Sequence, residues 1–240
     1  MSIDKIERKL LSLLSPDTAT SVKLLAQQLY VSESTARRYV NALAERGLVI
    51  RTHGGCLPSG AALDRNAPMY VRFSSEQEDK RRIAERAASL IPSTATVILD
   101  SSSTAFHMIP FLRTKQDLTV ITSGLKTAAA LCECNIKTVI LGGPIHSSNM
   151  SANSALAIQL ASNYNADFFF FSCDGLSEEG ELTDNSFEEC LLRRAFIKRA
   201  AKSVLLVDPS KRGKKFKYNL CSLEELDLCI TVEDGDAVLL

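Results

Sequence analysis

The sequence lacks the features that would indicate a metal site or a disulfide framework. Its seven cysteines include no Cys-x-x-Cys pair, Cys132 and Cys134 are separated by one residue, and only three histidines are present. This spacing does not suit zinc, and an odd number of cysteines in a 240-residue chain favours reduced, mostly buried thiols. We therefore expect no metal ion, no cofactor and a cytoplasmic location.

The sequence has no long apolar run, no internal repeat and no low-complexity tract, and we expect no signal peptide. The net charge is zero, but residues 1–57 hold eight Lys/Arg and five Asp/Glu, whereas the remaining residues hold 20 and 23. A basic segment ahead of a mildly acidic body favours a small module that contacts an anion. With 45% hydrophobic residues, the chain has enough apolar material for two domains.

The first sixty residues predict three helices followed by a hairpin. Apolar residues recur at helical spacing over residues 6–14, and Ser-Pro-Asp then ends that helix. Ser21 and Ser32 are placed to cap a second and a third helix, and the third runs to about Glu45. Residues 48–51 predict a short strand, and Thr-His-Gly-Gly predicts a tight tip after it. This arrangement is that of a winged helix-turn-helix.

A helical wheel of the third helix separates an apolar side from a polar one. The apolar side holds Ala36, Val40 and Leu43, with Tyr39 at its edge. The polar side holds Ser34, Arg38 and Asn41, with Arg37 on the flank. An isolated arginine pair is usually a solvated face, but in this pattern guanidinium groups and small neighbours favour a reader of the DNA major groove. The predicted DNA contacts are Ser32, Ser34, Thr35, Arg37, Arg38, Arg51 and His53.

The rest of the chain predicts a linker over residues 58–73 and an α/β domain over residues 74–240, after a DNA-binding domain over residues 1–57. A capping box at residues 74–77 begins a helix that Pro92 closes. The predicted strands are Thr96–Asp100, Leu118–Thr122, Lys137–Leu141, Asp167–Ser172, Ser203–Asp208 and Leu228–Thr231. The predicted helices between them include Ser103–Leu112, Leu125–Cys134, Ser151–Asn163 and Ser186–Ala201. Near-continuous apolar strands that alternate with helices favour a mostly parallel sheet covered on both faces.

Polar loops follow successive strands, and the carboxyl ends of parallel strands are where ligands bind in such folds. Residues 100–104 enter a helix with three serines and a threonine, which suits either a phosphate site or a well-capped helix. Lys211, which taken alone is more often solvated, and Asp174 would complete a site for a polyol phosphate: a cation for phosphate and a carboxylate for hydroxyls. The predicted effector-binding residues are Asp100, Ser101, Ser102, Ser103, Thr104, Ser123, Asp174 and Lys211.

Two stretches of the first domain resemble the DNA-binding module of the DeoR family of bacterial transcription regulators. LLAQQLYVSESTARR (residues 24–38) and RTHGG (residues 51–55) are similar to the family signature VSxxTIRRDL followed by RxHGGA. Tyr39 stands where the family has Asp, and Cys56 where it often has Ala. The resemblance implies a winged helix-turn-helix that binds double-stranded operator DNA, most often as a repressor.

Later loops resemble the effector domain of the same family over about residues 75–235. They are DSSST (100–104), TS (122–123), GG (142–143), DGLSEEGELT (174–183), ECLLRR (189–194) and DPSKRG (208–213). The resemblance implies a fold like that of ribose-5-phosphate isomerase and a phosphorylated sugar as effector. Four residues depart from the family pattern: Ser102 and Ser154 replace Gly, Ser123 replaces Asn, and Arg193 replaces Lys.

The sequence also allows two other hypotheses about function. In an isomerase-like enzyme with an accessory DNA-binding module, Asp174, Glu189 and Lys211 would supply base, acid and electrophile. A non-catalytic adaptor would use the helix-turn-helix for protein contacts. We favour a regulator without catalytic residues, which acts as a homo-oligomer (dimer or tetramer) because one winged helix covers only one half-site.

Overall fold

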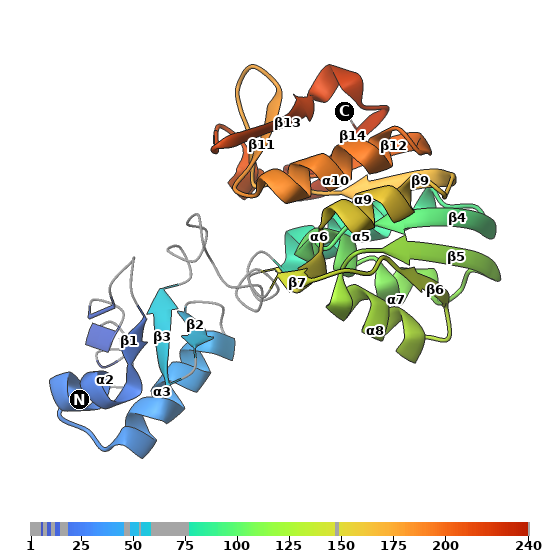
Figure 1. The fold of residues 1–240 in the computed structure, drawn as a ribbon. Helices are drawn as coiled ribbons and strands as arrows, with labels where there is room; N and C mark the ends of the chain where they lie inside the picture. The colour runs from blue at the N-terminus through green and yellow to red at the C-terminus, as the bar shows by residue number, and fades with distance from the viewer. Residues whose placement is uncertain are drawn as a thin grey trace. The chain divides into compact units, whose positions relative to one another are not determined.

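The computed structural model describes residues 6, 9–10, 13–14, 19–45, 49–52, 54–58, 77–146 and 149–239. The chain divides into two compact units, Met1–Ser75 and Glu76–Leu240, which we describe one at a time (Figure 1). Residues 7–8 and 11–12 of the predicted first helix, the predicted linker apart from its first residue, and His53 lie outside the described residues.

The described part of the first unit combines two helices with a small antiparallel sheet. The helices are α2 (Val22–Leu29) and α3 (Glu33–Glu45), and the strands are β1 (Thr20–Ser21), β2 (Val49–Thr52) and β3 (Gly55–Pro58). The strand order is β1-β3-β2, and β2 and β3 form a hairpin in which Thr52 pairs with Gly55. The prediction of a winged helix-turn-helix is confirmed, with this hairpin as the wing.

Local sequence explains where the two helices begin and how they pack. The Ser21 hydroxyl accepts a hydrogen bond from the Leu24 amide at 3.1 Å, and Tyr30 ends α2 in the left-handed conformation with φ of 56°. On α3, the apolar side of the helical wheel is buried as predicted: Ala36, Val40 and Leu43. Burial of this side leaves the opposite side of α3 to the solvent.

The second unit is built on a seven-stranded sheet. Its strands are β4 (Thr94–Leu99), β5 (Asp117–Thr122), β6 (Lys137–Ile140), β9 (Ala166–Phe171), β12 (Ala200–Leu206), β14 (Leu228–Glu233) and β15 (Asp236–Leu239). The order is β15-β14-β12-β9-β4-β5-β6, and every neighbouring pair is parallel except β14 with β15. The predicted mostly parallel sheet is confirmed, and its strand order reverses between β4 and β9, which makes that point the topological switch.

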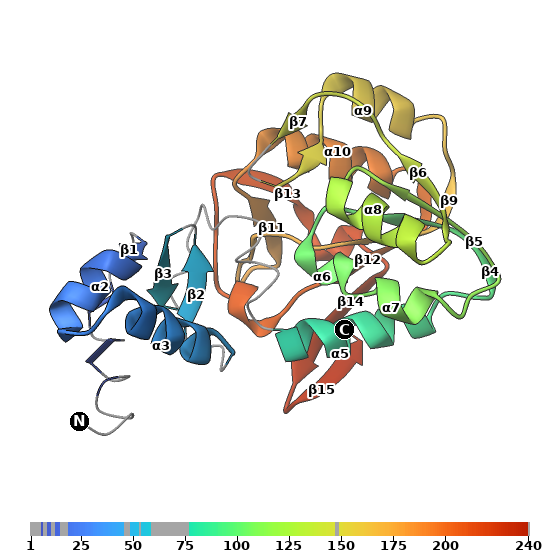
Figure 2. The same ribbon diagram turned by 90° about the horizontal axis from the view of Figure 1, so that it is seen from below.

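Helices cover both faces of this sheet (Figure 2). One face carries α5 (Gln77–Ser89), α6 (Ser103–Phe106), α7 (Ile109–Leu112) and α8 (Leu125–Glu133); the other carries α9 (Ala155–Ala161) and α10 (Phe187–Ile197). On β9, Phe170 packs on the first face, whereas Phe169 and Phe171 pack on the second. Alternate side chains of an apolar strand thus fill two cores, as expected for a doubly covered sheet.

Three predicted helices differ from the structure. Ser103–Leu112 is divided into α6 and α7, with Pro110 in the first turn of α7, where its missing N–H costs nothing. Ser151–Asn163 begins as a strand, β8 (Ser151–Ala152), which pairs with β7 (Ile145–His146) before α9 starts. Ser186–Ala201 ends at Ile197, because its last residues already belong to β12.

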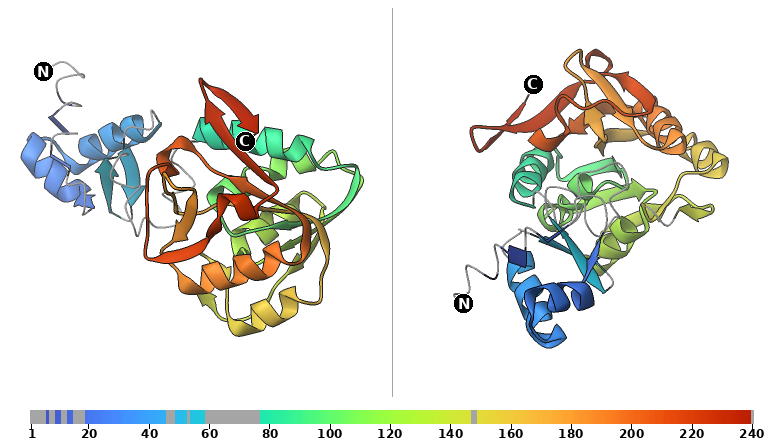
Figure 3. Two further views of the ribbon diagram at one scale, coloured as in Figure 1. Left: turned by 90° about the horizontal axis from the view of Figure 1, so that it is seen from above. Right: turned by 90° about the vertical axis from the view of Figure 1, so that its left-hand side faces the viewer.

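The loop predicted over residues 173–183 contains strands as well. β10 (Gly175–Leu176) and β11 (Glu181–Asp184) join β13 (Tyr218–Ser222) in a second antiparallel sheet with the order β10-β11-β13. Two short 3-10 helices, η2 (Pro209–Lys211) and η3 (Leu223–Glu225), flank β13, and the β14–β15 hairpin lies beside α5 (Figure 3). None of the described helices is long and apolar enough to cross a lipid bilayer.

Candidate functional site

The start of α3 presents a compact set of hydroxyl groups. Ser32 caps the helix by accepting a hydrogen bond from the Thr35 amide at 3.2 Å. Its Oγ also lies 2.9 Å from the hydroxyls of both Ser34 and Thr35. The three hydroxyls therefore surround the N-terminal end of α3, where free amides and the helix dipole favour an anion such as a DNA phosphate.

Three cationic side chains of the first unit are open to solvent. Arg37 and Arg38 on α3 and Arg51 on β2 are exposed, and none of them forms an ion pair with another described residue. Tyr39 is half-buried against the core of the first unit, so it packs beneath the helix. Asn41 departs from the helical wheel, since it is half-buried and its amide oxygen is enclosed without a partner among the described residues. The exposed polar set on α3 is thus smaller than the polar side predicted from the sequence.

In the second unit, one buried arginine joins three carboxylates near the switch point. We call this group the Arg193 cluster: Arg193, Asp100, Asp184 and Glu189. The guanidinium Nε lies 3.1 Å from Asp100 Oδ2, Nη1 lies 2.6 Å from Asp184 Oδ2, and Nη2 lies 3.6 Å from Glu189 Oε2. Arg193 is 5% exposed, so this arginine is part of the scaffold rather than a side chain open to solvent.

Burial sets the electrostatics of the Arg193 cluster. It raises the pKa of Asp184 from 3.8 to about 6, although the positive charge of Arg193 opposes the shift. Burial likewise raises the pKa of Asp100 above its usual value, again against the pull of Arg193. The pKa of Arg193 itself lies well above its usual value because the carboxylates outweigh desolvation. Three carboxyl groups thus surround one guanidinium group.

Asp100 also holds the loop after β4 in place. Its Oδ1 accepts from the Ser102 amide at 2.9 Å, and its Oδ2 accepts from the Ser172 amide at 3.2 Å. Because Ser172 follows β9, this one side chain ties together the ends of the two strands that flank the switch point. The Ser102 hydroxyl accepts from the Ala105 amide at 3.2 Å and so caps α6, and a well-capped helix is one of the two roles that the sequence predicts for this serine-rich loop.

Glu189 binds four donors through a single oxygen. Its Oε1 accepts hydrogen bonds from Ser151 Oγ at 2.7 Å, from Asn153 Nδ2 at 3.2 Å, from Ser101 Oγ at 3.3 Å, and from Asn149 Nδ2. We call these five residues, with Ser123 and Thr127 beside them, the Glu189 cluster. It joins the loops after β4 and β5, the segment around β8, and the first turn of α10, all at the carboxyl edge of the sheet.

Several polar atoms of the Glu189 cluster are buried without a partner among the described residues. They are Ser123 Oγ, Thr127 Oγ1, Asn149 Oδ1 and Asn153 Oδ1. Ser123 and Asn153 are 1% and 2% exposed, respectively, so water outside the protein does not satisfy them. Because buried polar groups are nearly always hydrogen-bonded, four such atoms in one place indicate a site that accepts polar groups from a ligand or from bound water.

Asp174 and Lys211 lie on the loops after β9 and β12, and the backbones of these loops form a bridge between Leu176 and Arg212. Burial raises the pKa of the neighbouring Cys173 thiol far above its usual value. Asp174 Oδ2 accepts from the backbone amide of Asn185 at 3.1 Å and from its side-chain amide at 2.8 Å. Lys211 is half-buried and forms no ion pair with a described residue. The loops after β9 and β12 therefore meet, as the carboxyl ends of neighbouring parallel strands should.

Sequence reasoning missed the residues that organise this edge. The sequence gives Glu189 a role only in the ECLLRR motif and as the acid of an isomerase-like enzyme, and it marks Arg193 only as a departure from the family pattern. Asn149 and Asn153 were not singled out, since isolated asparagines in a polar segment carry no distinctive spacing. Ser154, another departure, accepts from the Ala157 amide at 3.5 Å and caps α9. The one signal available was the placement of Glu189 in the first turn of a predicted helix, next to serine caps.

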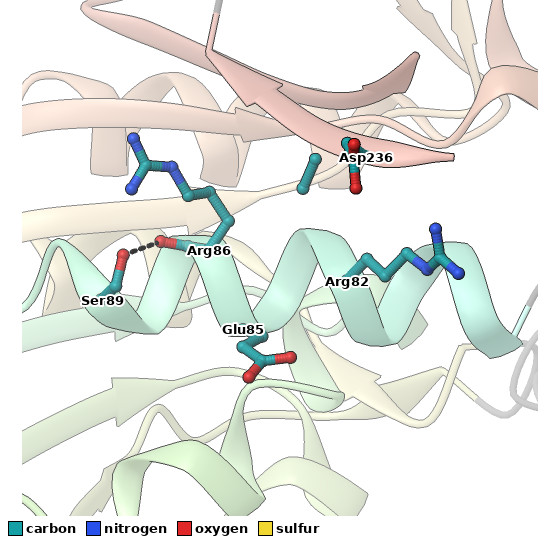
Figure 4. Close-up of a pocket in the computed structure, with 6 residues that line it drawn as sticks. Arg82, Glu85, Arg86, Ser89 and Asp236 are labelled. Carbon is teal, nitrogen blue, oxygen red and sulfur yellow. Dashed lines mark hydrogen bonds between the residues drawn. The ribbon is translucent and has the colours of Figure 1, made fainter. Parts of the chain in front are cut away.

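A separate surface depression of about 420 Å³ lies between α5 and β15 (Figure 4). Its lining residues are Arg82, Glu85, Arg86, Ser89, Asp236 and Ala237. Arg82 is already paired with Glu78 at 3.2 Å, and no lining residue follows β4, β5, β9 or β12. The depression is therefore distinct from the polar clusters at the switch point.

Comparison with known proteins assigns both units to one family. The model of the DeoR-like helix-turn-helix domain matches residues 7–58, and the model of the DeoR C-terminal sensor domain matches residues 75–233. Ribose-5-phosphate isomerase A from Neisseria gonorrhoeae shares the fold at a TM-score of 0.50 and 13% identity, over 68% of this chain and 96% of that one. At that identity, the likeness concerns the fold alone.

Two regulators are similar over most of the chain. The HTH-type transcriptional regulator GolR of Listeria innocua is 35% identical over 94% of this chain and 89% of its own length. The glycerol-3-phosphate regulon repressor of Escherichia coli is 29% identical over 88% of this chain and 83% of its own length. With a helix-turn-helix whose arginines face outward and a sensor domain on a doubly wound sheet, this chain belongs to the DeoR family of transcriptional regulators.

Proposed function

We propose that this protein represses a carbohydrate-metabolism operon and leaves its operator when a phosphorylated sugar binds at the carboxyl edge of the large sheet. The observation that carries the effector half of the proposal is the group of unpartnered buried polar atoms in the Glu189 cluster. The Escherichia coli relative is named as the repressor of a glycerol-3-phosphate regulon, which supports both the sign of regulation and the chemical class of the effector.

The DNA contact is assigned to α3 and the wing. Arg38 reads base edges in the major groove, whereas Arg37 and the hydroxyls at the start of α3 contact phosphates. Arg51 on β2, with His53, contacts the DNA beside the helix. The exposure of all three arginines and the compact hydroxyl set at the helix start support this assignment.

The effector contact is assigned to the loops after four parallel strands. The phosphate binds at Ser101–Thr104 and is neutralised by Lys211, which has no carboxylate partner among the described residues. Ser123 and Asp174 contact the sugar hydroxyls. Asp100 acts by holding the loop, because its carboxylate is already engaged by Arg193 and two backbone amides.

The protein acts in this proposal as a homo-oligomer in the cytoplasm and catalyses no reaction. Two recognition helices are needed to cover two half-sites, which a single copy of the first unit does not provide. The isomerase alternative required Glu189 as an acid. Its Oε1 accepts from four donors and its other oxygen faces Arg193, so it is a hydrogen-bond acceptor held in place. This arrangement favours sensing over proton transfer.

The test combines DNA binding and ligand binding on the full chain. An operator obtained by in vitro selection is labelled, and its binding is followed by fluorescence anisotropy while phosphorylated and unphosphorylated sugars are added. We expect a phosphorylated sugar to release the DNA and to raise the melting temperature with concentration, and its unphosphorylated form to do neither. Lys211→Ala should weaken this response. Equal response of the wild type and Lys211→Ala, or no response to any phosphosugar, would contradict the effector assignment.

A further inference from the structure

The two asparagines of the Glu189 cluster are held in a fixed orientation. Asn149 and Asn153 both direct Nδ2 at Glu189 Oε1, a carboxylate oxygen that only accepts hydrogen bonds. Each amide oxygen is consequently turned away from Glu189, and each is buried without a partner among the described residues. One carboxylate thus fixes the orientation of two side-chain amides, with the NH₂ group towards Glu189 and the oxygen away from it.

The segment that carries the two asparagines lies against the loop after β5, at the carboxyl edge of the large sheet. The Ala152 amide donates to the Ser123 carbonyl at 3.0 Å, and the Leu125 amide donates to the Met150 carbonyl at 2.8 Å. Gly124 lies so close to Ser101 that a Cβ on it would come within 3.1 Å of the Ser101 Cα. Asn153 therefore shares its surroundings with the unpartnered hydroxyl of Ser123, and the segment around β8 is part of the site.

From this geometry we propose that Asn149 and Asn153 form a subsite that accepts hydrogen bonds from effector hydroxyl groups and excludes carboxylates, with Glu189 as the positioning residue. The proposal rests on the proposed function, because it requires a phosphorylated ligand in the same site. Amide oxygens only accept, so they bind a hydroxyl as donor but find no proton on a carboxylate. The effector class is accordingly a polyol or sugar phosphate rather than a phosphorylated sugar acid.

The experiment uses two matched ligand pairs and isothermal titration calorimetry on the full chain. Glycerol 3-phosphate is compared with 3-phosphoglycerate, and sorbitol 6-phosphate with 6-phosphogluconate; within each pair a hydroxymethyl group is replaced by a carboxylate. Inorganic phosphate reports on the phosphate contact alone. At least one pair should bind. Within it, we expect the ligand with the hydroxymethyl group to bind about tenfold tighter or more than the ligand with the carboxylate, because the carboxylate leaves a buried acceptor without a donor.

Three variants separate positioning from folding. Asn153→Ala should weaken the polyol phosphate about tenfold and leave the Kd of inorganic phosphate within about twofold. Glu189→Gln offers an N–H to the asparagines, which lets their amides reverse, and the preference for hydroxyl over carboxylate should fall towards unity. Asn163→Ala is the control and should change neither value, because the side chain of this exposed asparagine donates only to the Gln159 and Leu160 carbonyls at the end of α9.

The outcomes distinguish the two proposals. If the wild type binds phosphosugars but Asn153→Ala, folded by its melting curve, keeps the full preference, the subsite is overturned and the effector assignment stands. The same holds if the carboxylate ligand binds as tightly as the hydroxyl ligand. If the wild type binds neither inorganic phosphate nor any of the four ligands, the phosphosugar function itself fails and the subsite with it.

Discussion

Arginine serves opposite purposes in the two units of this chain. On α3, Arg37 and Arg38 are exposed and have no ionic partner among the described residues. In the sensor domain, Arg193 is buried and meets three carboxylates. An exposed guanidinium stays hydrated until an anion arrives, whereas a buried one must carry its counter-charges within the fold. The comparison teaches that an arginine without an ionic partner in the fold is available to bind another molecule. An arginine that the fold neutralises holds the structure together.

Removal of the buried arginine should have the largest effect. Arg193→Ala leaves Asp100, Asp184 and Glu189 without a cation in a desolvated setting, and we expect it to destabilise the sensor domain by about 3–5 kcal/mol. Differential scanning calorimetry of the full chain measures this loss. Arg37→Ala is the control and should stay within about 0.5 kcal/mol of the wild type. If Arg193→Ala lowered the free energy of unfolding by less than about 1 kcal/mol, the buried arginine would not differ from the exposed ones in its effect on stability.

The exposed arginines should affect DNA binding and leave folding unchanged. Arg38→Ala should cost about 1–3 kcal/mol of specific binding and relax the preference at one base position, because a base contact is lost. Arg37→Ala should instead weaken all sequences alike and reduce the slope of log K against log salt by about 1, because a phosphate contact is lost. Anisotropy titrations at several salt concentrations measure both. Wild-type binding by both variants would refute the assignment to the groove.

The Arg193 cluster should also make stability depend on pH. Because the pKa of Asp184 is raised from 3.8 to about 6 in the folded chain, the folded state takes up a proton between these values before the unfolded state does. Stability therefore increases as pH falls from about 6 to about 4 through this residue, by at most about 1.4 kcal/mol per pH unit. Asp184→Asn should remove this contribution. Parallel pH profiles of the melting temperature for the two proteins would show that Asp184 does not titrate in this range.

The smallest effect concerns the cap of α6. Ser102→Ala removes the acceptor for the Ala105 amide and should cost about 1 kcal/mol, whereas Ser102→Gly should cost only a few tenths. Chemical denaturation curves resolve the difference between the two variants. If Ser102→Ala were as stable as the wild type, the cap would contribute nothing. The serine would then matter for the ligand alone.

Prediction from sequence worked best where contacts are local. The buried set on α3 follows from a repeat of 3.6 residues, and the capping serines of α2 and α3 lie three residues from the amides they bind. The six parallel strands were each found as an apolar run, because strands buried on both faces have few polar residues. The antiparallel strands β10 and β11 were missed, since two strands of two and four residues within an acidic, glycine-containing loop show no alternation.

The candidate effector site could be located from the sequence but not assembled from it. The rule that ligands bind after parallel strands directed attention to residues 100–104, 123, 174 and 211. It gave no reason to connect Glu189 with Asn149, 40 residues before it, or Arg193 with Asp100, 93 residues before it. Such contacts form between loops that the order of the strands in the sheet places side by side.

The sequence by itself determined the family, the helix-turn-helix with its outward arginines, and the alternation of strands and helices, because each can be recognised from short motifs and from the periodicity of neighbouring residues. Only the tertiary structure decided which polar residues are engaged and which are left with unpartnered atoms. Asp100 was expected to meet a ligand and is held by Arg193, whereas Asn153 was overlooked and has a buried, unpartnered amide oxygen. The reason is physical: burial and hydrogen-bond partnership are set by neighbours that the chain brings together from distant positions, and periodicity carries no information about them.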